Sequence, residues 1–84
     1  MKELNETVNP MLSSDYKDRF KAEYYQLKIR HDKLVNMCKL WDEGKLSFTP
    51  TCPRALYNDQ LEGMEIYLAV LKERAKLEDI VLEV

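Results

Sequence analysis

Apolar side chains recur with a helical period through two long segments of the chain. In each segment the spacing alternates between three and four residues, which is the pattern of a helix that packs one stripe against another helix. The first stripe comprises Phe20, Tyr24, Leu27, His31, Leu34, Cys38 and Trp41. The second stripe comprises Tyr57, Leu61, Met64, Leu68, Leu71 and Ala75. The pattern therefore predicts two helices that pack along a shared seam.

Helix-breaking residues stand at the ends of these segments. Gly44 occupies the place of a helix C-cap glycine. Pro50 excludes helix from the connection, and Pro53 suits the first position of the second helix. The predicted organisation is an N-terminal tail over residues 1–14 and a helical hairpin domain over residues 15–84, with a helix at about 14–43, a loop at 44–52 and a helix at about 53–80.

A second apolar set lies beside the seam and cannot be buried by two helices alone. Each exposed large side chain forgoes about 1.5–3 kcal/mol of burial. Either the tail and loop cover this set, or chains associate. We predict an all-α fold, an antiparallel two-helix hairpin that assembles into a homo-oligomeric helical bundle. The set comprises Tyr25, Ile29, Val35, Met37, Leu40, Leu56, Ile66, Tyr67, Val70, Leu77, Ile80 and Val81.

One glycine falls inside the second predicted helix. Gly63 costs that helix about 1 kcal/mol relative to alanine. The cost indicates either close approach of another helix at this position or simple tolerance.

Composition and charge narrow the function classes. With 84 residues the chain forms one domain at most. Its net charge of −2 argues against a dedicated nucleic-acid binder, which would normally be basic. No apolar run is long enough to span a membrane, and the N-terminus lacks the apolar core of a signal peptide. We expect a cytoplasmic protein whose two cysteines, Cys38 and Cys52, stay reduced.

Residues able to carry catalysis are scarce. His31 is the single histidine, and it falls on the predicted seam, where it is either a hydrogen-bonded core residue or a pH-sensitive, ligand-contacting group. Cys52 could pair with it as nucleophile and base only if the fold brought the two together. There is no glycine-rich phosphate loop and no metal-ligand spacing. We expect no enzyme, no catalytic residue, no metal site and no cofactor.

The first predicted helix is basic within an acidic chain. From Lys17 to Lys39 it carries seven basic and three acidic residues, whereas Pro53 to Val84 carries four basic and seven acidic residues. One interpretation is charge complementarity between the two helices. The other is an anion site, because flat rings for a base and cations for phosphates suit a nucleotide. The candidate ligand-binding residues are Lys21, Tyr24, Tyr25, Lys28, Arg30 and Arg54.

Three stretches carry a family resemblance. They are the run from Asp15 to Lys28, the loop Leu46-Ser47-Phe48-Thr49-Pro50-Thr51-Cys52-Pro53, and the run from Gln60 to Ala75. Over about residues 14–80 the chain resembles small helical proteins of crAss-like and other tailed bacteriophages and prophages. Its architecture and size are also similar to phage helical-hairpin anti-defence sponges, which sequester cyclic nucleotide immune signals. The resemblance implies a phage origin and a location in the host cell cytoplasm, and it brings no catalytic residue.

Two functions follow as hypotheses. The first is a non-enzymatic, phage-encoded counter-defence protein that sequesters a nucleotide-derived signal, such as a cyclic nucleotide, in clefts between subunits of an oligomer. The second is a protein–protein interaction module that binds or inhibits a host or phage protein and takes no small-molecule ligand.

Overall fold

The structure, a computed structural model, describes residues 1–82, and all regular structure in this range is helical. A short 3-10 helix, η1 (Leu4–Thr7), leads into α1 (Val8–Met11). Two long helices follow, α2 (Tyr16–Asp42) and α3 (Arg54–Leu77). The predicted all-α class is confirmed for the described residues.

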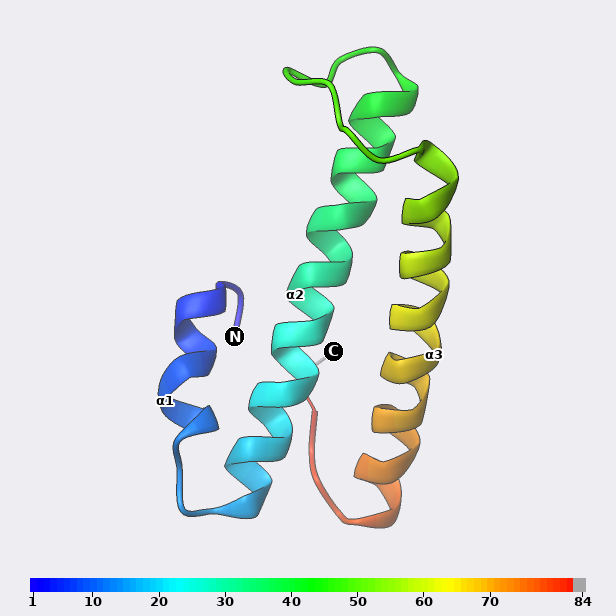
Figure 1. Cartoon of the computed structure of the whole chain (residues 1–84). Coiled ribbons are helices and arrows are strands. Elements are labelled where there is room, and N and C mark those ends of the chain that lie inside the picture. Colours follow the sequence, from blue (N-terminus) through cyan, green and yellow to red (C-terminus); the bar gives the residue numbers. More distant parts are fainter. Residues whose placement is uncertain (83–84) are drawn as a thin grey trace.

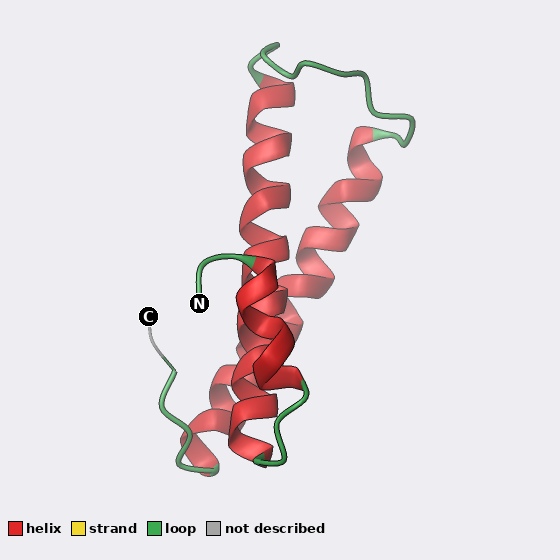
Figure 2. Ribbon diagram, turned by 90° about the vertical axis from the view of Figure 1, so that its left-hand side faces the viewer, coloured by secondary structure: helices red, strands yellow, loops and turns green. Residues whose placement is uncertain are grey.

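The two long helices lie side by side and run in opposite directions (Figure 1). A view from the side shows that their axes are inclined to one another (Figure 2). Every position of the predicted seam is buried or half-buried. The buried seam residues are Phe20, Tyr24, Cys38, Leu68, Leu71 and Ala75.

Residues 1–14, which we expected to form only a tail, contain η1 and α1, and both pack against α2. A capping box between Glu3 and Glu6 begins η1. Pro10 is tolerated because it lies in the first turn of α1, where backbone N–H groups have no helical partner. Thr7 is fully buried, donates to the Leu4 carbonyl at 2.7 Å and accepts from Gln26 Nε2 at 3.4 Å.

Both long helices end in a similar backbone turn. At the end of α2, Gly44 has a φ of 71° and the Lys45 N–H donates to the Leu40 carbonyl at 2.8 Å. At the end of α3, Asp79 takes the glycine position with a φ of 54°, and the Ile80 N–H donates to the Ala75 carbonyl at 2.8 Å.

The second helix therefore ends at Leu77, whereas the sequence predicted an end at about residue 80. No glycine follows Leu77 in the sequence, so the end of α3 at this residue was not predicted. The left-handed turn at Asp79 reverses the chain and buries Ile80 in the core. That core comprises Phe20, Tyr24, Tyr25, Leu68, Leu71, Ala75 and Ile80, with Met1, Leu27 and Leu82 packed against it.

The N- and C-terminal segments thus cover part of the second apolar set. Tyr25, Ile29 and Ile80 are buried. The outer side chains of α3 stay exposed, and no other described element packs over them. Within residues 1–82, no helix has the length and apolar character needed to cross a membrane.

Candidate functional site

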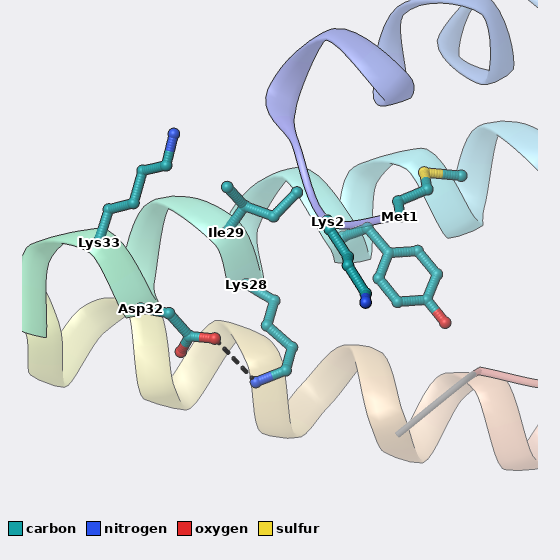
Figure 3. Close-up of a pocket in the computed structure, with 7 residues that line it drawn as sticks. Met1, Lys2, Lys28, Ile29, Asp32 and Lys33 are labelled. Atoms are coloured by element: carbon teal, nitrogen blue, oxygen red, sulfur yellow. Dashed lines mark hydrogen bonds and ion pairs between the residues drawn. The ribbon is translucent and has the colours of Figure 1, made fainter. Parts of the chain in front are cut away.

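A surface pocket of 370 Å³ opens on α2 where the N-terminal residues cross it (Figure 3). We call it the lysine pocket. Its lining residues on α2 are spaced by three and four positions, so one face of that helix presents them. The volume lies within the range of about 300–1,000 Å³ that is common for small-molecule sites. The lining comprises Met1, Lys2, Tyr25, Lys28, Ile29, Asp32 and Lys33.

The floor of the lysine pocket is apolar and firmly held. Tyr25 and Ile29 are each only 8% exposed, and Met1 adds a flexible apolar side chain. The Tyr25 ring packs edge to face on Tyr24, with ring centroids 5.2 Å apart. The floor thus offers an apolar surface for a flat organic ring.

The rim is basic. It carries three lysines and one carboxylate. Lys28 Nζ lies 3.2 Å from the Asp32 Oδ2 atom. Lys2 and Lys33 form no side-chain ion pair with another described residue, and in Figure 3 Lys33 extends away from Lys28. The pocket therefore keeps a positive excess that suits an anionic group.

His31 connects the pocket to α3. Its Nδ1 atom lies 2.9 Å from Asp32 Oδ1, and its Nε2 atom lies 2.9 Å from Glu65 Oε2. Burial alone would lower the pKa of His31, but hydrogen bonds to Glu65 and Asp32 outweigh it and raise that pKa. Burial alone would likewise raise the pKa of Asp32, whereas hydrogen bonds to His31 and Lys28 lower it. His31 is thus a half-buried seam residue whose two ring nitrogens both face carboxylates.

The structure brings two of the six candidate ligand-binding residues, Tyr25 and Lys28, into the lysine pocket. Lys21 lies on α2 before the pocket and is half-buried. Tyr24 is 3% exposed and belongs to the core, so its ring is not open to a ligand.

Arg30 and Arg54 lie elsewhere. Arg30 lines a second pocket, of 340 Å³, together with Arg19 and Tyr67. Arg54 stands at the loop end of the molecule, where its Nε and Nη2 atoms donate to the two Asp42 carboxylate oxygens at 3.0 and 3.1 Å. This hydrogen bonding raises the pKa of Arg54 and lowers that of Asp42. Arg54 therefore fastens α3 to α2.

Sequence reasoning missed Met1, Lys2, Ile29, Asp32 and Lys33 as pocket residues. Lys33 could have been found, because it follows Tyr25 and Ile29 at a spacing of four on one helical face. Lys2 could not, since its position depends on how η1 and α1 fold back along α2.

Cys38 is buried and Cys52 is exposed, and neither forms a disulfide. Among the residues that the structure describes, no group of three or more His, Cys, Asp or Glu side chains is arranged to hold a metal ion.

Of the known proteins compared with the chain, no curated protein and no solved structure matches it significantly. One protein family does match. The sequence profile of the Sequestin family matches residues 14–77, which run from just before α2 to the end of α3 and contain five of the seven residues of the lysine pocket. This match covers most of the chain, and the chain belongs to the Sequestin family.

Proposed function

We propose that this protein sequesters a nucleotide-derived ligand, such as a cyclic nucleotide, in the lysine pocket and releases it chemically unchanged. The family name indicates a sequestering role. The observation that carries the proposal is the joining of an apolar, aromatic floor to a lysine rim in one pocket of suitable volume.

The two parts of the pocket match the two parts of a nucleotide. Tyr25 and Ile29 offer apolar surface to a base. Lys2, Lys28 and Lys33 offer ammonium groups to phosphate oxygens. One chain supplies all of these groups, so this pocket does not require the cleft between subunits that the sequence analysis predicted.

The phage origin, the counter-defence role and the location in host cytoplasm belong to the same proposal, and they rest on the sequence resemblance. Sequestration needs no bond to form or break, which agrees with the expectation that the protein is not an enzyme. The interaction-module hypothesis makes the opposite prediction, because such a module would leave the lysine pocket empty.

Isothermal titration calorimetry against cyclic mononucleotides and cyclic dinucleotides tests the proposal. We expect saturable binding of a phosphate-bearing ligand and none of the matching nucleoside. Chromatography of the ligand after incubation should recover it intact. Lys28→Glu should weaken binding by at least about tenfold, since it places a carboxylate where a cation faces phosphate.

Lys45→Glu is the matched control. It makes the same charge change in the loop, at an exposed residue that does not line the lysine pocket. Equal loss of affinity in both variants would assign the effect to overall charge and not to the lysine pocket. Failure of every cyclic nucleotide to bind the unaltered protein would overturn the proposed ligand class.

A further inference from the structure

The imidazole of His31 lies between two carboxylates that come from different helices. Its Nδ1 atom is 2.9 Å from Asp32 Oδ1 on α2, and its Nε2 atom is 2.9 Å from Glu65 Oε2 on α3. The His31 side chain is 16% exposed, so little water competes for either nitrogen. A neutral imidazole has one N–H group and donates to one carboxylate, whereas an imidazolium donates to both. The arrangement therefore favours the protonated ring.

The carboxylate of Asp32 is shared between His31 and the lysine pocket. Its Oδ1 atom faces the imidazole, and its Oδ2 atom lies 3.2 Å from Lys28 Nζ. Figure 3 shows Asp32 and Lys28 joined at the pocket. His31 itself does not line the pocket. Any effect of His31 on a ligand therefore passes through Asp32.

The charges around the imidazole come from the two long helices. Within residues 1–82, the charged groups that act on His31 are Asp32 from α2 and Glu65 from α3. Burial would lower the pKa of His31, but hydrogen bonds to Glu65 and Asp32 raise it. Burial would raise the pKa of Asp32, but hydrogen bonds to His31 and Lys28 lower it. Near neutral pH, Asp32 therefore stays charged while His31 gains or loses its proton.

We propose that His31 is a positioning residue that sets how strongly the lysine pocket holds an anion, an inference that rests on the proposed function of that pocket. The protonated ring donates to Asp32 and offsets its charge, so Lys28 is free to turn toward a ligand. Once the ring is neutral, it satisfies only one carboxylate and no longer offsets the charge of Asp32. The Asp32 carboxylate then holds Lys28 more strongly.

The change in total charge acts in the same direction. Loss of the proton removes one positive charge beside a rim that carries Lys2, Lys28 and Lys33. An anion is then attracted less strongly. The affinity of the lysine pocket for an anion should therefore fall as the pH rises through the titration of His31.

Calorimetric titration with cyclic AMP across the neutral pH range tests the proposal. Its phosphodiester keeps one negative charge throughout this range, so a pH dependence of the affinity belongs to the protein. We expect the affinity of the unaltered protein to be about threefold to tenfold higher in mild acid than in mild base. An affinity that is constant with pH would overturn the proposal.

His31→Gln removes the proton but keeps a side chain that forms hydrogen bonds. Its affinity should match that of the unaltered protein in mild base and should not rise in acid. This variant keeps the amine of Met1, so any pH dependence that this amine contributes remains in both proteins. Equal pH profiles for His31→Gln and the unaltered protein would exclude His31 as the titrating group.

Glu65→Gln separates the charge of His31 from a purely structural role. Glu65 belongs to α3 and does not line the lysine pocket. Its loss removes one of the two carboxylates that favour the imidazolium, so the midpoint of the affinity profile should move to lower pH. The affinities at the acidic and basic limits should stay unchanged. An unmoved midpoint would contradict the proposal, because a structural role has no reason to follow the titration of His31.

Asp32→Asn tests whether the effect passes through the shared carboxylate. It should bind cyclic AMP more tightly than the unaltered protein in mild base, because Lys28 loses its ion pair. It should also lose most of the pH dependence. Retention of the full pH dependence in Asp32→Asn would reject the positioning role.

NMR titration of the free protein distinguishes failure of this inference from failure of the proposed function. The Asp32 carboxyl carbon and the Lys28 ε-carbon should each shift with the same midpoint as the His31 ring, and His31→Gln should lose this step. Signals that ignore the His31 midpoint would overturn the inference, whether or not a ligand binds. Absence of cyclic AMP binding at every pH would count against the proposed function, and the NMR titration would still decide the role of His31.

Discussion

The two halves of the α2–α3 pair use the same seam pattern but are buried to different degrees. In the half near the chain termini, five seam residues are buried and only Leu27 is half-buried. The five are Phe20, Tyr24, Leu68, Leu71 and Ala75. Near the loop, only Cys38 of the seam is buried. The remaining seam residues there are half-buried, namely Leu34, Trp41, Tyr57, Leu61 and Met64.

The difference follows from what covers the pair. Near the termini, η1 and α1 lie along α2, and the segment after α3 inserts Ile80 into the core. Near the loop, no described element lies over the two helices except the loop itself. Two helices can hide one stripe each, but they leave the edges of that stripe open to water until a third element closes them.

The loop half is held by polar and aromatic contacts instead. The Arg54 guanidinium donates two hydrogen bonds to the Asp42 carboxylate, and its Cζ atom lies 5.9 Å from the Trp41 ring centroid. Trp41 and Tyr57 meet edge to face, with ring centroids 5.8 Å apart. Exposed ion pairs of this kind contribute little to stability, so they fix the geometry of the loop end more than they stabilise it.

The largest expected effect comes from truncating one leucine in each half. Leu71 is 1% exposed, and Leu71→Ala should lower the free energy of unfolding by about 2–5 kcal/mol because it leaves a cavity. Leu61 is half-buried, so Leu61→Ala should cost only about 1–2 kcal/mol. Urea denaturation followed by circular dichroism, at one protein concentration, measures both.

Equal losses in the two variants would contradict this comparison. They would mean that the loop half is as well buried in solution as the half near the termini, for example by a partner chain. Repeating the measurement at several protein concentrations separates that explanation from a wrong assignment of burial.

The two helix ends offer a smaller and opposite pair of effects. Gly44 has a φ of 71°, so Gly44→Ala should destabilise the loop end by about 1 kcal/mol. Asp79 has a φ of 54°, so Asp79→Gly should stabilise the other end by about 0.5 kcal/mol. Thermal unfolding of both variants beside the unaltered protein measures the shifts. A gain from Gly44→Ala would show that the left-handed turn after α2 does not form.

The smallest effect is the pH dependence at His31. The pKa of His31 is raised in the folded state, so its stabilising contribution is complete below the ordinary pKa of about 6.5. It is lost as the pH rises through the folded-state pKa. His31→Gln should therefore destabilise the protein more in mild acid than in mild base. Chemical denaturation across this pH range measures the difference.

The carboxylate of Asp32 sets the lower end of the pH range over which this effect operates. The pKa of Asp32 is lowered in the folded state, so its contribution is lost as the pH falls through that lowered value. A difference between His31→Gln and the unaltered protein that stays constant with pH would show that the contacts of His31 with Asp32 and Glu65 do not depend on its charge.

Candidate site residues were predicted less well than the helices. Composition singled out tyrosine and basic residues on the first helix, and Tyr25 and Lys28 do line the lysine pocket. Tyr24 and Tyr25 are adjacent in sequence and both belong to the core, yet only Tyr25 lines the lysine pocket. About 100° of helical rotation separates neighbouring residues, so only the packing of α3 and the tail decides which ring faces the pocket.

The sequence by itself determined the helical class, the seam and the stop at Gly44. The helical class and the seam follow from the local period of the apolar residues. The end of the first helix follows from the backbone preference of glycine, which does not depend on tertiary contacts. Only the tertiary structure decided that residues 4–11 are helical and packed on α2, that α3 ends early at Leu77, and that Met1 and Lys2 line one pocket with Lys28 and Lys33. The physical reason is that contacts between distant segments depend on how the chain closes on itself, and no local pattern records that closure.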